Sequence, residues 1–353
     1  MAKAKYSGKA IRINDVDVPP GTRQTLHLPV AMLYTRTPVE MPVNVINGRN
    51  DGPRLFVTAA IHGDELNGIE IIRRLRKSPA LRRLRGTLLM IPIVNSFGVL
   101  QHSRYLPDRR DLNRCFPGSE TGSLAARLAN LLMTEIVSQC THGIDLHTAA
   151  VHRSNLPQIR CNLSDPETER LARAFGAPVI IDAQIRDGSL RGAAADLGVP
   201  TLLYEAGEAL RFDEICINGG VRGILNVMRE LGMLPQSRSK TKTREAVVAR
   251  SSSWLRSPEG GLFRSHVRLG ARVNTDDLMG TVTDPFSDGE TELLAHTSGI
   301  VIGRGRLPLV NEGDALFHIA RMARPGEAAE AIKAFAHAGQ QEEGLPENES
   351  AII

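Results

Sequence analysis

Two histidines and one glutamate in this sequence are of the types that bind a catalytic metal ion. His62 and Glu65 stand three residues apart in the segment HGDE, and His147 closes the segment DLH. Two neutral imidazoles and a carboxylate are the protein ligands of many catalytic zinc sites, whose fourth position is open to water. An isolated HxxE pair is more often a chance match on a helix surface, so the prediction depends on where the fold places these residues.

Asp145 stands two residues before His147. Residues two apart in a strand point to the same face. Asp145 can therefore reach the ring nitrogen of His147 that does not face a metal, as the partners of metal-binding histidines commonly do. The alternative is a buried histidine that is simply satisfied by a carboxylate, and the pattern leaves both interpretations open.

A basic segment between these motifs contains Arg104 and the run DLNR, which ends in Asn113 and Arg114. An arginine can bind a carboxylate through two parallel hydrogen bonds, and a neighbouring asparagine amide can add another. Because Arg109 and Arg110 lie in between, the segment also fits a solvated charged loop. We favour carboxylate binding because the predicted metal ligands are present as well.

Glu205 follows an apolar run, TLLY. A carboxylate at the end of a buried strand is costly unless it is paired or functional. Beside a metal ion, Glu205 could take a proton from water and pass it to a leaving amine. Glu208 competes for this role, but it lies beyond Gly207 in the predicted turn, so we assign the general base to Glu205.

The elements that must position these residues alternate between strands and helices. Continuous apolar runs predict buried strands over 54–61, 87–95, 143–148 and 199–207. Apolar residues at helical spacing predict helices over 65–78, 123–140 and about 213–232. This alternation is typical of an α/β sandwich. The motifs fall at or after the ends of strands, where ligands of α/β sheets bind.

Shifts in composition divide the chain into parts. We expect an N-terminal extended segment packing on the catalytic domain (1–41), the catalytic domain (42–235), a polar and basic linker (236–252), a small β domain with glycine turns (253–322) and a tail (323–353).

Composition excludes some classes of function. The chain has 353 residues, a net charge of +4 and only 4% aromatic residues, and its arginines are spread out. These features favour a small anionic substrate over nucleic acid. The four cysteines form no CxxC pair, no stretch is long enough for a membrane helix, and the N-terminus lacks the apolar core of a signal peptide. We therefore predict a cytoplasmic protein with free thiols and without nucleic-acid or membrane partners; a homo-oligomer is left open.

The ordered set HGDE, DLNR, DLH and a strand-terminal E-x-G resembles the succinylglutamate desuccinylase/aspartoacylase family over roughly residues 42–230. The resemblance implies a zinc-carboxypeptidase-like α/β/α sandwich with a mixed sheet. The C-terminal β domain resembles the barrel-sandwich of biotinyl and lipoyl carriers. A carrier needs a lysine at a hairpin tip, however, and no lysine occurs between Lys242 and Lys333. A structural role or a wall at the entrance of the site fits the β domain better.

The resemblance also implies roles for particular residues. His62, Glu65 and His147 would bind one zinc ion, and Glu205 would be the general base. Arg104 would polarise the scissile carbonyl, while Asn113 and Arg114 would hold the substrate carboxylate. The spacing from Arg104 to DLNR is slightly longer than in an aspartoacylase, so Arg109 is the alternative for the first of these arginines. Nearby basic residues, namely His152, Arg153, Arg160 and Arg191, are left unassigned.

These observations predict a zinc-dependent deacylase that hydrolyses the amide of an N-acyl amino acid with zinc-activated water. A metallocarboxypeptidase acting on small peptides would use the same residues and is the alternative. A binding module that keeps only the fold would lack a ligand or the base, and here all four are present. The identity of the acyl group and of the amino acid depends on the shape of the pocket.

Overall fold

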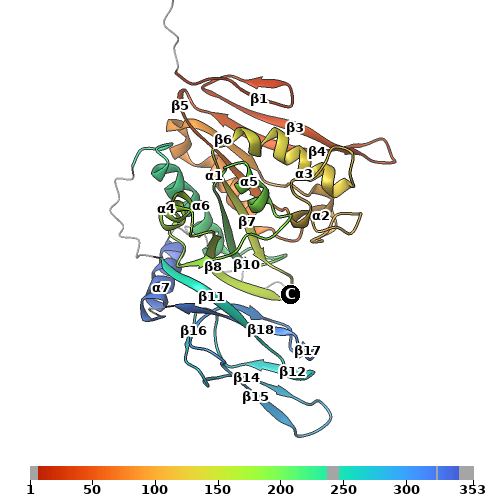
Figure 1. Cartoon of the computed structure of the whole chain (residues 1–353), viewed down its shortest axis with the longest axis vertical. Helices are drawn as coiled ribbons and strands as arrows, with labels where there is room; N and C mark the ends of the chain where they lie inside the picture. The colour runs from red at the N-terminus through yellow and green to blue at the C-terminus, as the bar shows by residue number, and fades with distance from the viewer. Residues whose placement is uncertain (1–6, 237–245, 323–324, 342–353) are drawn as a thin grey trace, which may run out of the picture.

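The structure is a computed structural model that describes residues 7–236, 246–322 and 325–341. Strands and helices alternate up to residue 230 and strands dominate after it (Figure 1). In the first part the strands are β1 (Ile11–Ile13), β2 (Val16–Val18), β3 (Thr22–Met32), β4 (Pro38–Asn47), β5 (Asn50–Ala59), β6 (Arg85–Ile91), β7 (His142–Ala149), β8 (Arg153–Cys161), β9 (Val179–Asp182) and β10 (Thr201–Glu208). The helices there are α1 (Asn67–Lys77), α2 (Ser96–Leu100), α3 (Leu124–Glu135), α4 (Pro166–Phe175), α5 (Leu190–Asp196) and α6 (Glu214–Glu230), with short 3-10 turns η1 (Pro79–Arg83), η2 (Leu112–Arg114) and η3 (Val137–Gln139).

The central sheet lies between two layers of helices. Alternate residues of its strands face opposite sides, so neighbours such as Phe56 and Val57 belong to two different cores. The core that contains Val57 also contains residues of α1, α4 and α6, whereas the core that contains Phe56 contains residues of α3 and α5. Burial of each such large apolar side chain contributes about 1.5–3 kcal/mol. The predicted α/β/α sandwich is therefore confirmed.

The sheet is mixed, as predicted. Strands β6, β5, β7 and β10 run parallel to one another along the chain of pairings β6–β5–β7–β10. Strand β8 pairs antiparallel with β10 along the edge of β10 that faces away from β7. The sequence analysis did not predict β8, because its residues RSNLPQIRC mix charged, polar and proline positions that do not read as a buried strand. This missed strand brings Gln158 and Arg160 next to Glu205.

The C-terminal part is rich in strands, as predicted. Its elements are β11 (Val247–Arg256), β12 (Gly261–Ser265), β13 (Arg272–Val273), β14 (Leu278–Thr283), β15 (Glu290–Leu294), β16 (Gly299–Gly305), β17 (Leu309–Val310), β18 (Ala315–Met322) and helix α7 (Pro325–Gln341). Strands β15, β14, β12 and β17 form a second sheet, which encloses an apolar core together with residues of β16 and β18.

The two parts share one continuous sheet. Strand β11 pairs parallel with β9 and antiparallel with β18, and β18 pairs with β16. Strand β16 then pairs with β8, which itself pairs with β9. The five strands β8, β9, β11, β18 and β16 therefore close a ring of hydrogen-bonded neighbours. Strand β11 crosses between the two parts in Figure 1.

Two of the segments expected from the sequence lie partly outside the described residues. The segment expected as a linker, 236–252, lies partly outside the described residues, and from Val247 onward it forms the first half of β11. The first half of the expected tail contains α7, which packs against α6 through Phe335 and Gly219, while residues 342–353 lie outside the described residues. Among the described residues, no helix is long and apolar enough to cross a membrane.

Candidate metal centre

His62, Glu65 and His147 come together although they are up to 85 residues apart in sequence. His62 and Glu65 lie in the turn between β5 and α1, where the Glu65 amide donates to the His62 carbonyl at 3.2 Å. Gly63 is required in this turn, because a Cβ there would lie 1.9 Å from the carbonyl carbon of Gly98. His147 lies near the end of β7, which pairs directly with β5. All three residues are buried.

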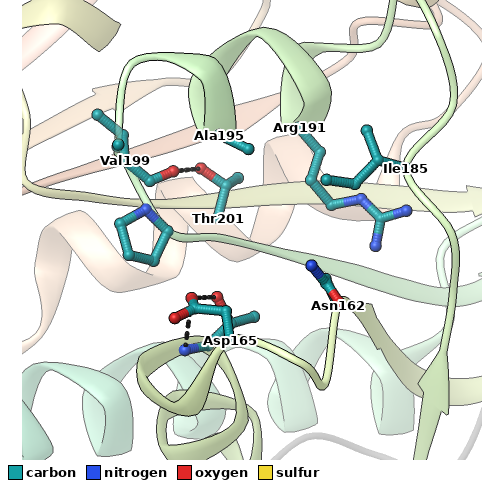
Figure 2. A pocket seen from close by; sticks show the side chains of 10 residues that line it. Asn162, Asp165, Ile185, Arg191, Ala195, Val199 and Thr201 are labelled. Carbon is teal, nitrogen blue, oxygen red and sulfur yellow. Dashed lines mark hydrogen bonds between the residues drawn. The ribbon is translucent and has the colours of Figure 1, made fainter.

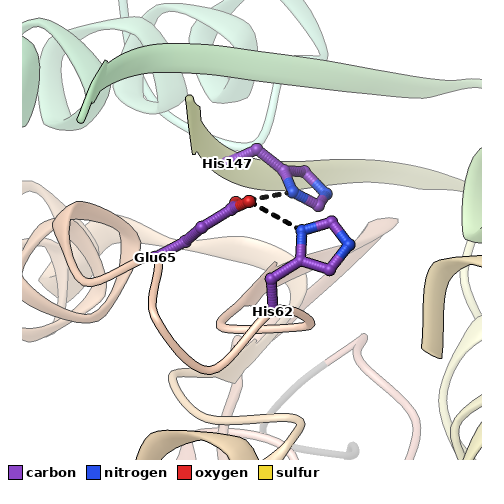
Figure 3. Close-up of side chains that lie close together, drawn as sticks. All are labelled: His62, Glu65 and His147. Atoms are coloured by element: carbon purple, nitrogen blue, oxygen red, sulfur yellow. Dashed lines mark hydrogen bonds and ion pairs between the residues drawn. The ribbon is translucent and has the colours of Figure 1, made fainter. Parts of the chain in front are cut away.

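The carboxylate of Glu65 bridges the two imidazoles (Figure 3). Its Oε1 lies 2.7 Å from Nδ1 of His62, and its Oε2 lies 2.8 Å from Nδ1 of His147. One ligand atom from each residue can be chosen so that all lie within 4.8 Å of one another. The backbone amide of Thr148 also donates to Oε2 at 3.0 Å, which fixes the carboxylate.

Each imidazole has a second carboxylate at its outer nitrogen. Nε2 of His62 lies 3.1 Å from Asp111, and Nε2 of His147 lies 2.8 Å from Asp145. Asp145 is in turn held by the hydroxyl of Thr58 at 2.8 Å. An ionised carboxylate only accepts hydrogen bonds, so Nε2 carries the proton in each neutral ring and Nδ1 keeps its lone pair. The two lone pairs then both face the Glu65 carboxylate, and this set of donors fits a cation such as zinc.

The pKa shifts of the three residues also show that a positive charge at the centre of the cluster is favourable. Burial lowers the pKa of His62, but the charge of Glu65 and the hydrogen bond to Asp111 outweigh it, so the pKa is raised. Burial likewise lowers the pKa of His147, but Asp145 and Glu65 raise it well above its usual value. For Glu65, burial raises the pKa, yet the two imidazoles hold it well below the usual range. A metal ion would supply the charge that protons on Nδ1 provide without it.

Arg104 lies directly beside the cluster. Its Nε and NH2 groups donate to Asp111 at 3.1 and 3.0 Å, and its NH1 lies 3.3 Å from Nδ1 of His62 and 3.5 Å from Glu65. Asp111 therefore orients Arg104 so that one guanidinium nitrogen faces the centre. Arg109, the alternative for this role, is exposed on the loop before Asp111.

Glu205 lies next to His147 on the neighbouring strand. The two residues are register partners in the parallel pair of β10 and β7, so their side chains share one face of the sheet. The carboxylate forms an ion pair with Arg160 on β8. The competitor Glu208 is buried after a register shift, and its carboxylate lies 3.5 Å from both Arg211 and Arg306.

Asn113 and Arg114 lie in η2, directly after Asp111. The side-chain oxygen of Asn113 accepts a hydrogen bond from the backbone amide of Leu190 at 2.9 Å, which holds the buried side chain in place. Arg114 is exposed, and its NH1 donates to the Asn113 carbonyl at 2.5 Å.

Sequence reasoning assigned no role to three contributors to the site. Asp111 belongs to the DLNR motif, but its contact with His62 was not predicted because 49 residues separate them. The Thr58 hydroxyl on β5 donates to Asp145 on β7. One indication of this contact was present in the sequence, because Thr58 and Asp145 are both polar residues in otherwise apolar strands. Arg160 was considered, but only the antiparallel placement of β8 brings it to Glu205.

Comparisons with known proteins agree with this architecture. Residues 51–231, more than half of the chain, match the family described as "Succinylglutamate desuccinylase/Aspartoacylase catalytic domain". An N-alpha-acetyl-L-2,4-diaminobutyric acid deacetylase from Halomonas elongata is 27% identical over 303 residues, covering 80% of this chain and 86% of the relative.

Solved structures give the same result. A succinylglutamate desuccinylase/aspartoacylase from Rhodobacter sphaeroides superposes with a TM-score of 0.77 at 26% identity, covering 88% of this chain and 100% of that one. A product-bound ectoine utilization protein from Ruegeria pomeroyi has a TM-score of 0.76 at 22% identity, covering 90% and 99% of the two chains, and supports the fold.

The fold and the family match define an enzyme of the deacylase class. The chain belongs to the succinylglutamate desuccinylase/aspartoacylase family. The resemblance inferred from the four motifs is thereby confirmed.

Proposed function

We propose that this protein is a zinc-dependent deacylase that hydrolyses the amide bond of an N-acyl amino acid. The observation that carries the proposal is the buried His62–Glu65–His147 cluster, in which each imidazole has its outer nitrogen on a carboxylate and Glu205 stands beside His147. The deacetylase activity named for the Halomonas elongata relative supports the substrate class.

In this proposal His62, Glu65 and His147 would hold one zinc ion, the two histidines through Nδ1 and Glu65 through its carboxylate. When bound, the ion would act as a Lewis acid toward the scissile carbonyl and would activate water. The hydrogen bonds to Asp111 and Asp145 keep both imidazoles in the tautomer that can bind it.

Glu205 is the general base and later the general acid. Its carboxylate takes a proton from the attacking water and returns it to the amine that leaves. Arg160 keeps the carboxylate in place through its ion pair. We prefer Glu205 to Glu208 because Glu208 is placed between Arg211 and Arg306.

Arg104, Asn113 and Arg114 bind the substrate. NH1 of Arg104 faces the centre and would stabilise the negative charge that develops on the carbonyl oxygen. The side-chain oxygen of Asn113 is bound to Leu190, so its NH2 group is the part that can donate to a substrate carboxylate. The exposed guanidinium of Arg114 adds a paired donor group for the same carboxylate.

Turnover of a mixed panel of N-acetyl and N-succinyl amino acids and short peptides, followed by mass spectrometry, tests this proposal. The expected result is release of a free amino acid from an acyl compound, loss of this activity with a chelator, and its return with zinc. Removal of C-terminal residues from the peptides instead would favour a metallocarboxypeptidase. If turnover is unchanged after a chelator has removed the metal from the protein, the proposed role of zinc is overturned.

The location of the enzyme also remains a prediction. The four cysteines, Cys115, Cys140, Cys161 and Cys216, are free thiols in the structure. Free thiols fit a reducing compartment, which supports the cytoplasmic location that we propose.

A further inference from the structure

A small cavity lies beside α5, on the face of β10 that also carries Glu205. Its volume is about 260 Å³, and Thr201 at the start of β10 forms part of its wall. Thr201 and Glu205 are register partners of Gly143 and His147 on β7, so both side chains face the same side of the sheet. Four residues of strand correspond to roughly 13 Å, which separates the cavity from the candidate metal centre.

Arg191 gives this cavity a buried cation that lacks a full set of partners. The residue is only 9% exposed, and its NH2 donates to the carbonyl of Gln184 at 2.9 Å. Its NH1 is buried and has no hydrogen-bond partner among the described residues. An unpaired buried donor on a charged group is costly, so a ligand that accepts from NH1 would relieve the cost.

Charge around Arg191 favours an anion. Burial lowers the pKa of Arg191, and the positive charges of Arg160 and Arg186 lower it further. Glu205 is the nearby carboxylate that acts in the opposite direction, but it is engaged by Arg160. A bound anion would therefore compensate a local excess of positive charge.

Asn162 supplies a second donor on the same side of the cavity. Its side-chain oxygen accepts from the amide and hydroxyl of Ser164 at 3.1 and 2.6 Å, which leaves the amide nitrogen pointing into the cavity (Figure 2). The other polar residues are already used: Thr201 donates to Val199, and Asp165 caps α4 by accepting from Glu167 and Thr168.

The rest of the wall is apolar. Ile185, Ala195, Val199 and Pro200 line it. Asp165 lies on the side away from Arg191 (Figure 2), so a negative group is repelled there and attracted to the Arg191 end. Two donors at one end, apolar walls and a small volume define the ligand chemistry.

We propose that this cavity binds a carboxylate carried on a short apolar stem, with Arg191 and Asn162 as its recognition residues. Because roughly 13 Å of strand separate the cavity from the candidate metal centre, a small molecule other than the substrate would supply this carboxylate.

The wall of the cavity also contacts the proposed substrate-binding residues. Leu190, next to Arg191, donates its amide to Asn113, and Gly188 accepts from the Phe116 amide at 3.0 Å. Gly188 has φ +70°, and a Cβ there would lie 2.5 Å from the carbonyl oxygen of Arg114. A ligand on Arg191 would therefore steady the segment that holds Asn113 and Arg114.

Hydrogen exchange measured by mass spectrometry on the metal-loaded full chain tests binding without any need for turnover. Butyrate is the probe, and butyramide is its uncharged control. Butyrate at ten times its Kd should slow exchange in residues 183–191 by about tenfold, whereas butyramide should not. If butyrate up to about 0.1 M does not slow exchange, the proposal is overturned, because a Kd of about 0.1 M is only tenfold below the 1 M standard state.

Three variants assign the effect to the cavity. Arg191→Gln should weaken butyrate binding by about tenfold or more, because it removes a charged donor. Ala195→Leu fills the cavity from an exposed backbone position and should block binding while Arg191 and the fold remain. Arg186→Gln removes the same charge from an exposed neighbour and should bind butyrate as the wild type does. Protection that persists in both Arg191→Gln and Ala195→Leu would overturn the proposal.

Turnover then tests whether the ligand of the cavity is a molecule other than the substrate. If Arg191→Gln lowers kcat/KM about tenfold or more for N-acyl amino acids with a carboxylate side chain, and much less for those with an alkyl side chain, the substrate itself reaches Arg191 and the proposal of a separate ligand is overturned. If a separate molecule supplies the carboxylate, the variant should leave this preference unchanged while butyrate protection is lost.

Discussion

At the scale of single residues, the candidate centre depends on pairs of groups that orient one another. Glu65 bridges two imidazoles, and Asp111 forms hydrogen bonds with both His62 and Arg104. Because these groups are buried, each unsatisfied partner would be costly. Substitutions that keep the shape but change one proton or one charge are therefore the most informative tests.

Glu205→Gln should keep the metal and lose most turnover. The three proposed metal ligands are untouched, but an amide cannot take the proton from water, so kcat should fall by about 10²- to 10⁴-fold. Metal content by atomic spectroscopy and kcat on the identified substrate check this. Glu208→Gln is the matched control, because it removes a buried carboxylate three residues further on. Near-normal turnover in Glu205→Gln, or an equal loss in the control, would remove Glu205 from the mechanism.

Asp145→Asn should weaken zinc binding by about 10- to 100-fold. An amide NH2 facing Nε2 of His147 favours the ring tautomer with its proton on Nδ1, the nitrogen proposed to bind zinc. Competition with a chromophoric chelator measures the change. Asp64→Asn, in the same turn as two of the proposed ligands, serves as the control for the loss of a buried carboxylate. Unaltered zinc affinity in Asp145→Asn would show that this contact does not tune the site.

At the scale of elements, strand ends bring the chemistry together. The carboxyl ends of β5, β7 and β10 lie side by side, which places His62, His147 and Glu205 at one edge of the sheet. The neighbouring strands of the closed ring carry polar residues as well. His318 on β18 is buried, stacks on Trp254 of β11 with ring centroids 4.5 Å apart, and has Nε2 2.9 Å from the Ser252 hydroxyl.

His318 should make the stability of this ring depend on pH. Burial and the charge of Arg160 lower the pKa of His318 to about 3. In the unfolded chain its pKa is about 6.5, so between these values the unfolded state binds more protons than the folded state. The contribution of His318 is then complete above pH 6.5 and is lost as pH falls toward 3, by at most about 1.4 kcal/mol per pH unit.

Comparison of the wild type with His318→Gln between pH 4.5 and 7 checks this. The free energy of unfolding should fall more steeply with acid in the wild type than in the variant. The single tryptophan, Trp254, stacks on His318 and reports the transition by fluorescence. Parallel pH profiles for the two proteins would mean that the buried imidazole is not held in its neutral form.

At the scale of the whole molecule, the C-terminal part is built into the same sheet as the metal centre. Strands β8 and β9 are bonded to β16 and β11, and Leu156, Val179 and Ile181 pack in one core with Ile300 and Ala320. A domain joined only by a linker would share neither hydrogen bonds nor a core. The two parts should therefore unfold together.

Denaturant titration tests this cooperativity. Trp254 fluorescence reports the C-terminal part, and residual turnover reports the metal centre, so the two midpoints should coincide. The measurement should also be made on metal-free protein, with far-ultraviolet circular dichroism in place of turnover, because bound metal stabilises only the part that holds it. Separate midpoints in both forms would contradict the continuity of the sheet.

Much of the site could be predicted from the sequence because the motifs stand at strand ends. The apolar runs before His62, His147 and Glu205 predicted buried parallel strands, and such strands present their carboxyl ends at one edge. Local patterns also predicted the alternation of strands and helices that is typical of an α/β sandwich, and the family resemblance implied the three α/β/α layers. The family resemblance followed from the order of four short motifs and was confirmed over residues 51–231.

Only the tertiary structure decided the contacts between residues far apart in sequence. Asp111 on His62, Arg160 on Glu205 and the closure of β16 onto β8 depend on which strands become neighbours. Strand β8 carries no clear alternation, and its antiparallel place beside β10 follows from hydrogen bonding and packing across the whole sheet. The sequence by itself therefore determined the chemistry available and the layers that hold it. The tertiary structure decided which charges meet, because distance in space, which sets electrostatic energy, is not encoded by local pattern.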